Sequence, residues 1–131
     1  MLDGGSRDGT VEMLESCSDS VDRWISGPDG GVSDAFNKGI ALARGELIGL
    51  LNAGDSYEPE AVASIVSAYL ASPGTDVFCG SIRLSEPQGL VVECLSSPAR
   101  LDKETSVYHP TVFVRRSAYD KFGLFDLRYK Y

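Results

Sequence analysis

The chain has 131 residues, which is the size of one domain. Its 12 Lys and Arg against 19 Asp and Glu give a formal net charge of -7. This acidity argues against nucleic acid and anionic membranes as partners, because both need a basic face. No apolar run approaches the roughly 20 residues of a membrane span. The three cysteines are widely spaced and form no CxxC pair, which indicates a reduced, cytoplasmic protein without a zinc site.

The first residues predict the end of a buried strand that runs into a turn. Asp8 or Thr10 is then placed to cap a short helix that carries Leu14 on its apolar face. The run Val21–Ser26, with its Trp and Ile, predicts the next strand. This is the start of a strand–helix alternation.

A glycine-rich loop, Gly27–Gly31, leads to Ser33, a good N-cap residue. The following helix has one apolar stripe and ends at Gly45. The apolar run Leu47–Leu51 is typical of a strand buried on both sheet faces. Pro59 suits the first turn of a further helix. The residues predicted for the buried face of that helix are Val62, Ile65, Val66, Tyr69 and Leu70.

The second half is richer in strands. Residues 76–84 and 90–95 predict two strands, joined as a β-hairpin by the polar residues 85–89. Residues 109–114 predict another strand, and Ser117–Phe122 a short helix. The alternation in the first half predicts an α/β domain with a mostly parallel sheet flanked by helices, and the second half adds the hairpin.

Three polar loops each follow a predicted strand and precede a helix. They are residues 3–8, 27–34 and 52–55. In an open α/β sheet, ligands bind in such loops at the carboxyl ends of the strands. Helix N-termini beside glycine-rich loops offer N–H groups to phosphate. A carboxylate such as Asp55 repels phosphate unless it holds a divalent cation that bridges the two groups. The sequence therefore predicts a site for a nucleotide diphosphate that carries a transferable group.

Each of these features also has a purely structural interpretation. Any one of the loops alone is more often just a turn, and Asp55 alone is more often a solvated turn residue. His109 is more often a structural histidine than a catalyst, and Arg115 and Arg116 form a solvated pair in this interpretation. The functional interpretation depends on all three loops lying along one sheet edge.

The order of these motifs resembles family 2 glycosyltransferases. Residues 3–10, DGGSRDGT, are similar to that family's D-x-x-S-x-D-G-T turn. Residues 28–39, PDGGVSDAFNKG, are similar to its P-D-x-G-x-x-D-A-x-N-K-G segment. Residues 43–55 resemble the segment that leads to its metal-binding corner, and residues 109–111 and 122–126 resemble a later acceptor-side stretch. The resemblance covers nearly the whole chain.

The resemblance implies a GT-A fold for a single, partial glycosyltransferase domain over residues 1–131. Residues 1–75 would form the nucleotide-sugar-binding half and residues 76–131 the acceptor-side half. The implied reaction moves a sugar, with inversion, from a nucleotide-diphosphate donor to a saccharide or lipid-linked acceptor, as in polysaccharide biosynthesis. A UDP-sugar is the expected donor. The parent protein would be cytoplasmic or peripheral to the inner membrane face.

The resemblance also implies site residues. Asp3 would bind the base of the nucleotide, Asp55 would hold Mg²⁺ or Mn²⁺, and His109 would lie near the acceptor. The implied nucleotide-sugar residues are Asp3, Ser6, Asp29, Asp34, Asn37 and Lys38. The metal corner departs from the family pattern, since Gly54 supplies no carboxylate.

Two further departures leave an alternative open. The family's first strand–helix unit and its C-terminal acidic base have no counterpart among these motifs, so the catalytic residue stays unassigned. The alternative is a catalytically silent, truncated nucleotide-binding module that associates through an exposed sheet edge. A nucleotidyltransferase is disfavoured, because no glycine-rich loop near the start carries Lys or Arg in number.

Overall fold

The chain forms two compact units in a computed structural model that describes residues 1–17, 19–85, 89, 91–104 and 106–129. Unit 1 consists of residues 1–44 and 123–131, and unit 2 of residues 45–122. These units are defined by contacts within the structure. The predicted division into a nucleotide-sugar-binding half, residues 1–75, and an acceptor-side half, residues 76–131, concerns function and stays a prediction.

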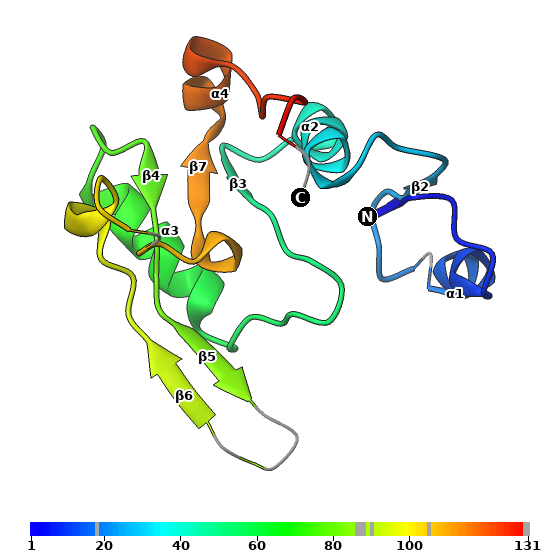
Figure 1. The fold of residues 1–131 in the computed structure, drawn as a ribbon, viewed down its shortest axis with the longest axis horizontal. Coiled ribbons are helices and arrows are strands. Elements are labelled where there is room, and N and C mark those ends of the chain that lie inside the picture. Colours follow the sequence, from blue (N-terminus) through cyan, green and yellow to red (C-terminus); the bar gives the residue numbers. More distant parts are fainter. Residues whose placement is uncertain (18, 86–88, 90, 105, 130–131) are drawn as a thin grey trace. The chain divides into compact units, whose positions relative to one another are not determined.

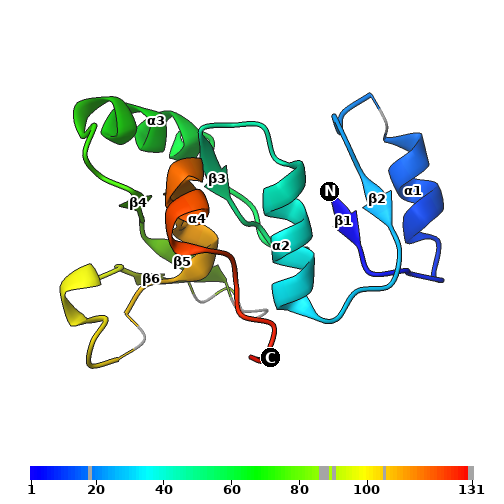
Figure 2. The same ribbon diagram turned by 90° about the horizontal axis from the view of Figure 1, so that it is seen from above.

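Unit 1 is built on a pair of parallel strands. β1 (Leu2–Asp3) pairs with β2 (Ile25–Ser26), so that Leu2 lies opposite Ile25. The strands lie between α1 (Thr10–Ser16) and α2 (Val32–Leu42), as Figure 2 shows. Each helix buries one aliphatic side chain, Leu14 from α1 and Ile40 from α2. This confirms the predicted strand–helix alternation, although β2 is shorter than the predicted run.

The start of α2 differs from the prediction. Its N-cap is Gly31, with φ at +109°, a conformation that glycine adopts without a steric penalty. Ser33, the predicted cap, is instead inside the helix and buried, and its hydroxyl donates to the Tyr129 carbonyl at 3.3 Å. The prediction failed because a hydroxyl near a helix start can be used by a distant backbone carbonyl as well as by the local N–H groups.

Unit 2 contains a sheet of order β3-β7-β4. β7 (Phe113–Arg115) runs antiparallel to both β3 (Leu47–Gly49) and β4 (Val77–Phe78), so β3 and β4 are parallel to each other with β7 between them. α3 (Ala61–Ala71) lies behind this sheet in Figure 1, and α4 (Arg116–Phe122) follows β7 directly. The domain is α/β, but the described strands pair mostly antiparallel, because β7 returns between the strands that the helix connects.

The predicted hairpin is present, with different ends. β5 (Ile82–Ser85) and β6 (Val91–Cys94) pair antiparallel, with Ile82 opposite Cys94. The predicted single strand over residues 76–84 is wrong, because the backbone leaves the first sheet after β4 and passes Gly80 before β5 begins. Residues 86–88 and 90 of the hairpin lie outside the described part.

Two short 3₁₀ helices, η1 (Pro98–Arg100) and η2 (His109–Thr111), lie between β6 and β7. The second replaces the start of the strand predicted over residues 109–114, since Pro110 favours a helical turn and cannot donate to a sheet.

The buried face predicted for α3 is largely exposed. Val62, Val66 and Leu70 are 51%, 43% and 72% exposed, whereas Ile65 and Tyr69 are half-buried. Apart from Ser64 and Ser67 the helix is apolar, so the apolar pattern of its sequence only weakly indicates which side the sheet covers. Among the described helices, α3 included, none is both long and apolar enough to cross a membrane.

Candidate functional site

Asp3 is the hydrogen-bonding centre of unit 1. Its Oδ2 accepts from the Ser26 hydroxyl at 2.6 Å and from the backbone N–H groups of Gly5 and Ser6 at 3.1 and 3.0 Å. Its Oδ1 accepts from the Ser6 hydroxyl. These bonds, that from Ser26 foremost, lower the pKa of Asp3 to about 2, because they favour the charged form. The carboxylate at the end of β1 is therefore ionised and fixed in orientation.

Two of the three predicted loops come together at this carboxylate. The Gly27 N–H donates to the Asp3 carbonyl at 3.1 Å, continuing the parallel pairing of β1 and β2. A Cβ added at Gly4 would lie 3.0 Å from Asp29 Oδ2, so the two loops approach each other closely here. Loops 3–8 and 27–34 thus form one polar rim, as predicted.

The glycine-rich loop is held by carboxylates of its own. Asp34 Oδ2 accepts from the Gly30 N–H and Asp29 Oδ1 accepts from the Gly31 N–H, both at 2.9 Å. Lys38 Nζ lies 2.8 Å from Asp34 Oδ2, and this neighbour lowers the pKa of Asp34. These two N–H groups are therefore already bonded, and the ammonium group of Lys38 places a positive charge beside them.

A small pocket of about 80 Å³ opens beside Asp3. It is lined by Leu2, Asp3, Ile25, Ser26, Gly27, Pro28, Asp29, Ala35 and Lys38. Three of the predicted nucleotide-sugar residues, Asp3, Asp29 and Lys38, thus lie at one cavity. Ser6 and Asp34 are each hydrogen-bonded or ion-paired to one of these three.

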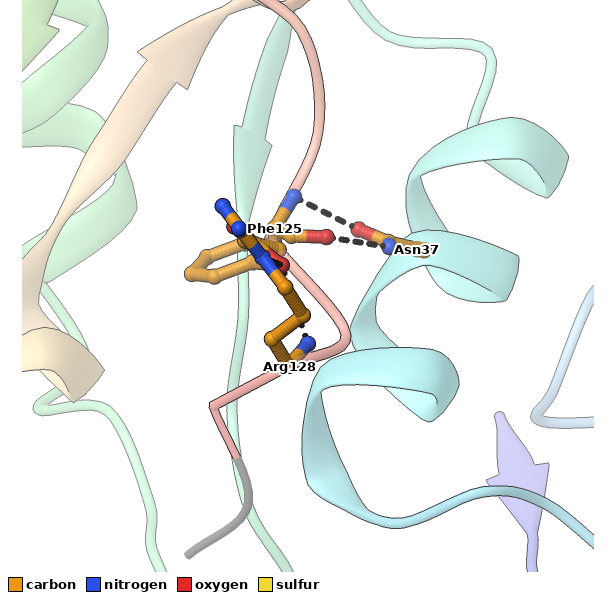
Figure 3. A network of polar contacts seen from close by, with 4 residues as sticks. Asn37, Phe125 and Arg128 are labelled. Atoms are coloured by element: carbon orange, nitrogen blue, oxygen red, sulfur yellow. Dashed lines mark hydrogen bonds and ion pairs between the residues drawn. The ribbon is translucent and has the colours of Figure 1, made fainter.

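Asn37 has a different environment from the other predicted residues. Its side-chain amide donates to the Phe125 carbonyl and accepts from the Phe125 N–H, both at 2.9 Å (Figure 3). The predicted contact of Asn37 with a nucleotide stays untested, but both ends of its amide are engaged with the protein backbone.

Asp55 and His109 belong to unit 2, so the convergence of the third loop with the first two stays a prediction. Asp55 is exposed and lines a cavity of about 580 Å³. The other lining residues include Ser56, Tyr57, Glu58, Ser64, Ser81, Arg83, Ser85, Thr111 and Phe113. Glu58 and Arg83 form an ion pair at 2.8 Å in this lining. The cavity therefore combines hydroxyl, aromatic and charged side chains.

The aromatic part of this cavity is tightly packed. The rings of Tyr57 and Phe113 lie 5.4 Å apart, and a Cβ at Gly49 would lie 2.7 Å from Phe113 Cε1. The Tyr57 hydroxyl is buried and has no hydrogen-bond partner among the described residues, and its burial raises the pKa of Tyr57. Only glycine at position 49 leaves room for these two rings.

Asp55 offers one carboxylate to a divalent cation, which is fewer protein ligands than a metal site built from protein alone would have. Among the described residues, no three His, Cys, Asp or Glu side chains cluster as a metal site. Mg²⁺, however, commonly takes only one or two carboxylates and fills its shell with water and phosphate oxygens. Glu58 lines the same cavity but is already paired with Arg83. Asp55 could therefore be the single protein carboxylate of a cation whose other ligands come from a diphosphate.

The remaining candidates lie at the edges of these sites. His109 is exposed at the start of η2, and its neighbours Pro110 and Thr111 line the larger cavity. Asp126, in the later motif, is bound by Arg128 at 2.6 Å, which lowers the pKa of Asp126 and makes it a weaker base. The Glu58–Arg83 pair has no counterpart in the sequence-based prediction, because its members are 25 residues apart and neither lies in a recognised motif.

Comparison with known proteins gives the family. The profile of Glycosyl transferase family 2 matches residues 1–93. The chain is 44% identical over 69 residues, 52% of its length, to an uncharacterized glycosyltransferase of Mycobacterium tuberculosis, of which the match covers 26%. It is 28% identical over 134 aligned residues, 99% of its length, to a PGL/p-HBAD biosynthesis glycosyltransferase of Mycobacterium bovis, of which the match covers 52%. A chondroitin synthase of Pasteurella multocida is 34% identical over 90 residues, which are 67% of this chain and 9% of that protein.

The chain belongs to glycosyl transferase family 2. This confirms the resemblance on which the residue assignments are based. The chain spans about half or less of the length of each of these curated relatives.

Proposed function

We propose that this protein takes part in transferring a sugar, with inversion, from a nucleotide-diphosphate donor to a saccharide or lipid-linked acceptor. The observation that carries the proposal is the meeting of two family motifs, residues 3–10 and 28–39, at one pocket beside Asp3. The relatives support it in general terms, since they are named as glycosyltransferases and as a chondroitin synthase. Polysaccharide biosynthesis is the proposed process.

The pocket of unit 1 suits the base of a uridine nucleotide. Asp3 and Asp29 both line it, and a carboxylate accepts the imide N–H of uracil at neutral pH. Lys38 at the pocket wall supplies positive charge for the diphosphate. A UDP-sugar is therefore the proposed donor.

Asp55 is the proposed ligand of Mg²⁺ or Mn²⁺. When bound, the cation would neutralise charge on the departing diphosphate. The chain's own contribution is a hard oxygen ligand on an exposed loop, where Asp55 lines a cavity large enough for a saccharide. The hydroxyl groups of that cavity and its two neighbouring aromatic rings suit the hydroxyls and apolar faces of a sugar.

Calorimetric titration tests this proposal. UDP should release heat on binding, more strongly with Mn²⁺ than without it. Asp3→Asn should weaken UDP binding with or without metal, whereas Asp55→Asn should remove only the gain that Mn²⁺ gives. Asp22→Asn and Asp102→Asn are matched controls, because each removes one exposed carboxylate that lines neither cavity. The absence of UDP heat, or equal losses in the control variants, would contradict the proposal.

A second candidate function is association without catalysis. The observation that favours it is the exposure of large apolar side chains, among them Leu70, Leu95 and Phe122 at 71–72%. Among the described strands, β1 pairs only with β2, which leaves its other edge open to a strand from a second chain. Light scattering distinguishes the two functions: a monomer that turns over a UDP-sugar excludes the second.

A further inference from the structure

α2 presents two opposite faces to two different parts of unit 1. Successive helix residues are rotated by roughly 100°, so residues 33, 36 and 37 share one face and residues 34, 35 and 38 the other. Ala35 and Lys38 line the small pocket, and Asp34 bonds the glycine-rich loop beside it. The face that carries Asn37 is turned away from this pocket.

The second face holds the segment that follows α4. The Asn37 amide bonds both the N–H and the C=O of Phe125 at 2.9 Å, as a neighbouring strand would (Figure 3). The Ser33 hydroxyl donates to the Tyr129 carbonyl at 3.3 Å. The rings of Phe36 and Phe125 lie 5.4 Å apart. Three side chains on one face of α2 therefore contact the segment at Phe125 and, four residues later, at Tyr129.

The segment is itself stiffened next to this contact. The guanidinium group of Arg128 binds the Asp126 carboxylate through two nitrogens, at 2.6 and 2.9 Å, and the Arg128 N–H donates to the same carboxylate. A turn closed in this way presents Phe125 and Tyr129 together to α2. The segment of residues 124–129 is therefore a preformed partner for the helix.

We propose that Asn37 is a positioning residue: by clamping residues 124–129 onto one face of α2, it fixes the helix so that Asp34 and Lys38 stay in place at the pocket on the other face. The inference rests on the proposed nucleotide site. A bound nucleotide would contact Lys38, and it would reach the segment only through the helix. By linkage, the segment and the nucleotide then stabilise each other's position.

The proposal predicts effects on both faces of the helix. In Asn37→Ala, the N–H of Phe125 loses its acceptor and should exchange with solvent faster. The N–H groups of Gly30 and Gly31, on the far side, should also exchange faster. UDP affinity should fall about three- to tenfold, the factor expected from the loss of one or two hydrogen bonds. Alanine is a better helix former than asparagine, so a weaker helix would not explain these changes.

Amide exchange read by ¹⁵N NMR, together with UDP titration, tests the proposal. Ala41→Ser is the matched control, because Ala41 is an exposed α2 residue that does not line the small pocket and forms none of the contacts with residues 124–129 described above. Asn37→Asp keeps the acceptor for the Phe125 N–H but places a carboxylate oxygen against the Phe125 carbonyl. Its UDP affinity should therefore recover toward wild type as the pH falls and the new carboxyl becomes a donor.

The outcomes separate this inference from the proposed function. If wild-type protein binds UDP and Asn37→Ala binds it equally well, the positioning role is wrong and the nucleotide site stands. If wild-type protein does not bind UDP, the proposed function is wrong. Exchange at Gly30 and Gly31 then decides the clamp: unchanged rates in Asn37→Ala overturn it, and faster rates absent from Ala41→Ser support it.

Discussion

Arg115 should stabilise unit 2 far more than an exposed arginine would. From β7, its Nε donates to the Thr75 carbonyl at 2.7 Å and its guanidinium also donates to the Ser72 carbonyl at 3.3 Å. The same group lies 4.0 Å over the Tyr69 ring. These contacts join the end of α3 to the sheet. Hydrogen bonds from charged donors contribute about 1.5–3 kcal/mol each, and an exposed cation–π contact about 0.5–1 kcal/mol.

Arg115→Met keeps the apolar stem and removes these contacts. Because the bond to the Ser72 carbonyl is long, we count only the bond to the Thr75 carbonyl and the ring contact, which together contribute about 2–4 kcal/mol. Arg115 is half-exposed, so we expect the lower part of that range, a loss of about 2–3 kcal/mol in the free energy of unfolding. Arg115→Lys keeps the charge over the ring and one donor, so it should lose about half as much.

Amide exchange in α3 measures this effect where it occurs. The slowest-exchanging amides of Ala61–Ala71 should exchange roughly 30- to 150-fold faster in Arg115→Met, the factor that corresponds to 2–3 kcal/mol. Exchange within threefold of wild type would refute the reasoning. Equal losses in the Met and Lys variants would show that the charge and the ring contact contribute nothing.

Two further predictions concern the sites. Gly49→Ala should destabilise unit 2 by about 1–3 kcal/mol, because the added methyl group would displace the Phe113 and Tyr57 rings that line the larger cavity. Denaturant unfolding measures the loss of stability, and tyrosine fluorescence reports the displaced ring. Unchanged stability would contradict the close packing. Asp3 has its pKa lowered from 3.8 to about 2 by the Ser26 hydroxyl and its neighbours, so its contribution to stability is present above pH 4 and is lost as the pH falls through 2. The protection factors of the β1 and β2 amides, which correct for the intrinsic pH dependence of exchange, should fall across this window in wild-type protein but not in Asp3→Asn, and identical pH profiles would refute the assignment.

The sequence predicted features that depend on local patterns. The helix around Leu14, the helix around Ile40 and the hairpin were each indicated by apolar spacing and turn residues, and the structure contains all three. The meeting of loops 3–8 and 27–34 was predicted because parallel strands end at the same sheet edge, and the meeting of loop 52–55 with them stays a prediction. These inferences need only neighbours in sequence and the regular geometry of strands.

What the sequence did not predict depends on partners far along the chain. Arg115 and Arg116 were interpreted as a solvated pair, but Arg116 donates twice to the Gly45 carbonyl, 71 residues away, at 3.0 and 3.1 Å. Asn37 lies within a nucleotide-site motif, yet its amide bonds Phe125, 88 residues away. A side chain's local motif does not reveal which distant backbone groups the fold brings to it.

The exposed face of α3 has a related explanation. Apolar periodicity indicates that a helix face is buried, but α3 is apolar apart from Ser64 and Ser67, and tertiary contacts decide the covered side. Tyr69 lies on that side, against Phe78 at 6.2 Å, whereas Leu70, the next residue, is exposed.

Residue-resolved NMR titration with UDP and a divalent cation tests the central claim most directly. UDP should shift the amides of residues 3–6, 26–31 and 34–38 with or without Mg²⁺, a diamagnetic ion that leaves the signals sharp. It should shift those of residues 54–58 only when Mg²⁺ is present. UDP at millimolar concentration that leaves the amides of residues 3–6 and 26–31 unshifted, or that shifts only residues outside these segments, would contradict a nucleotide site beside Asp3.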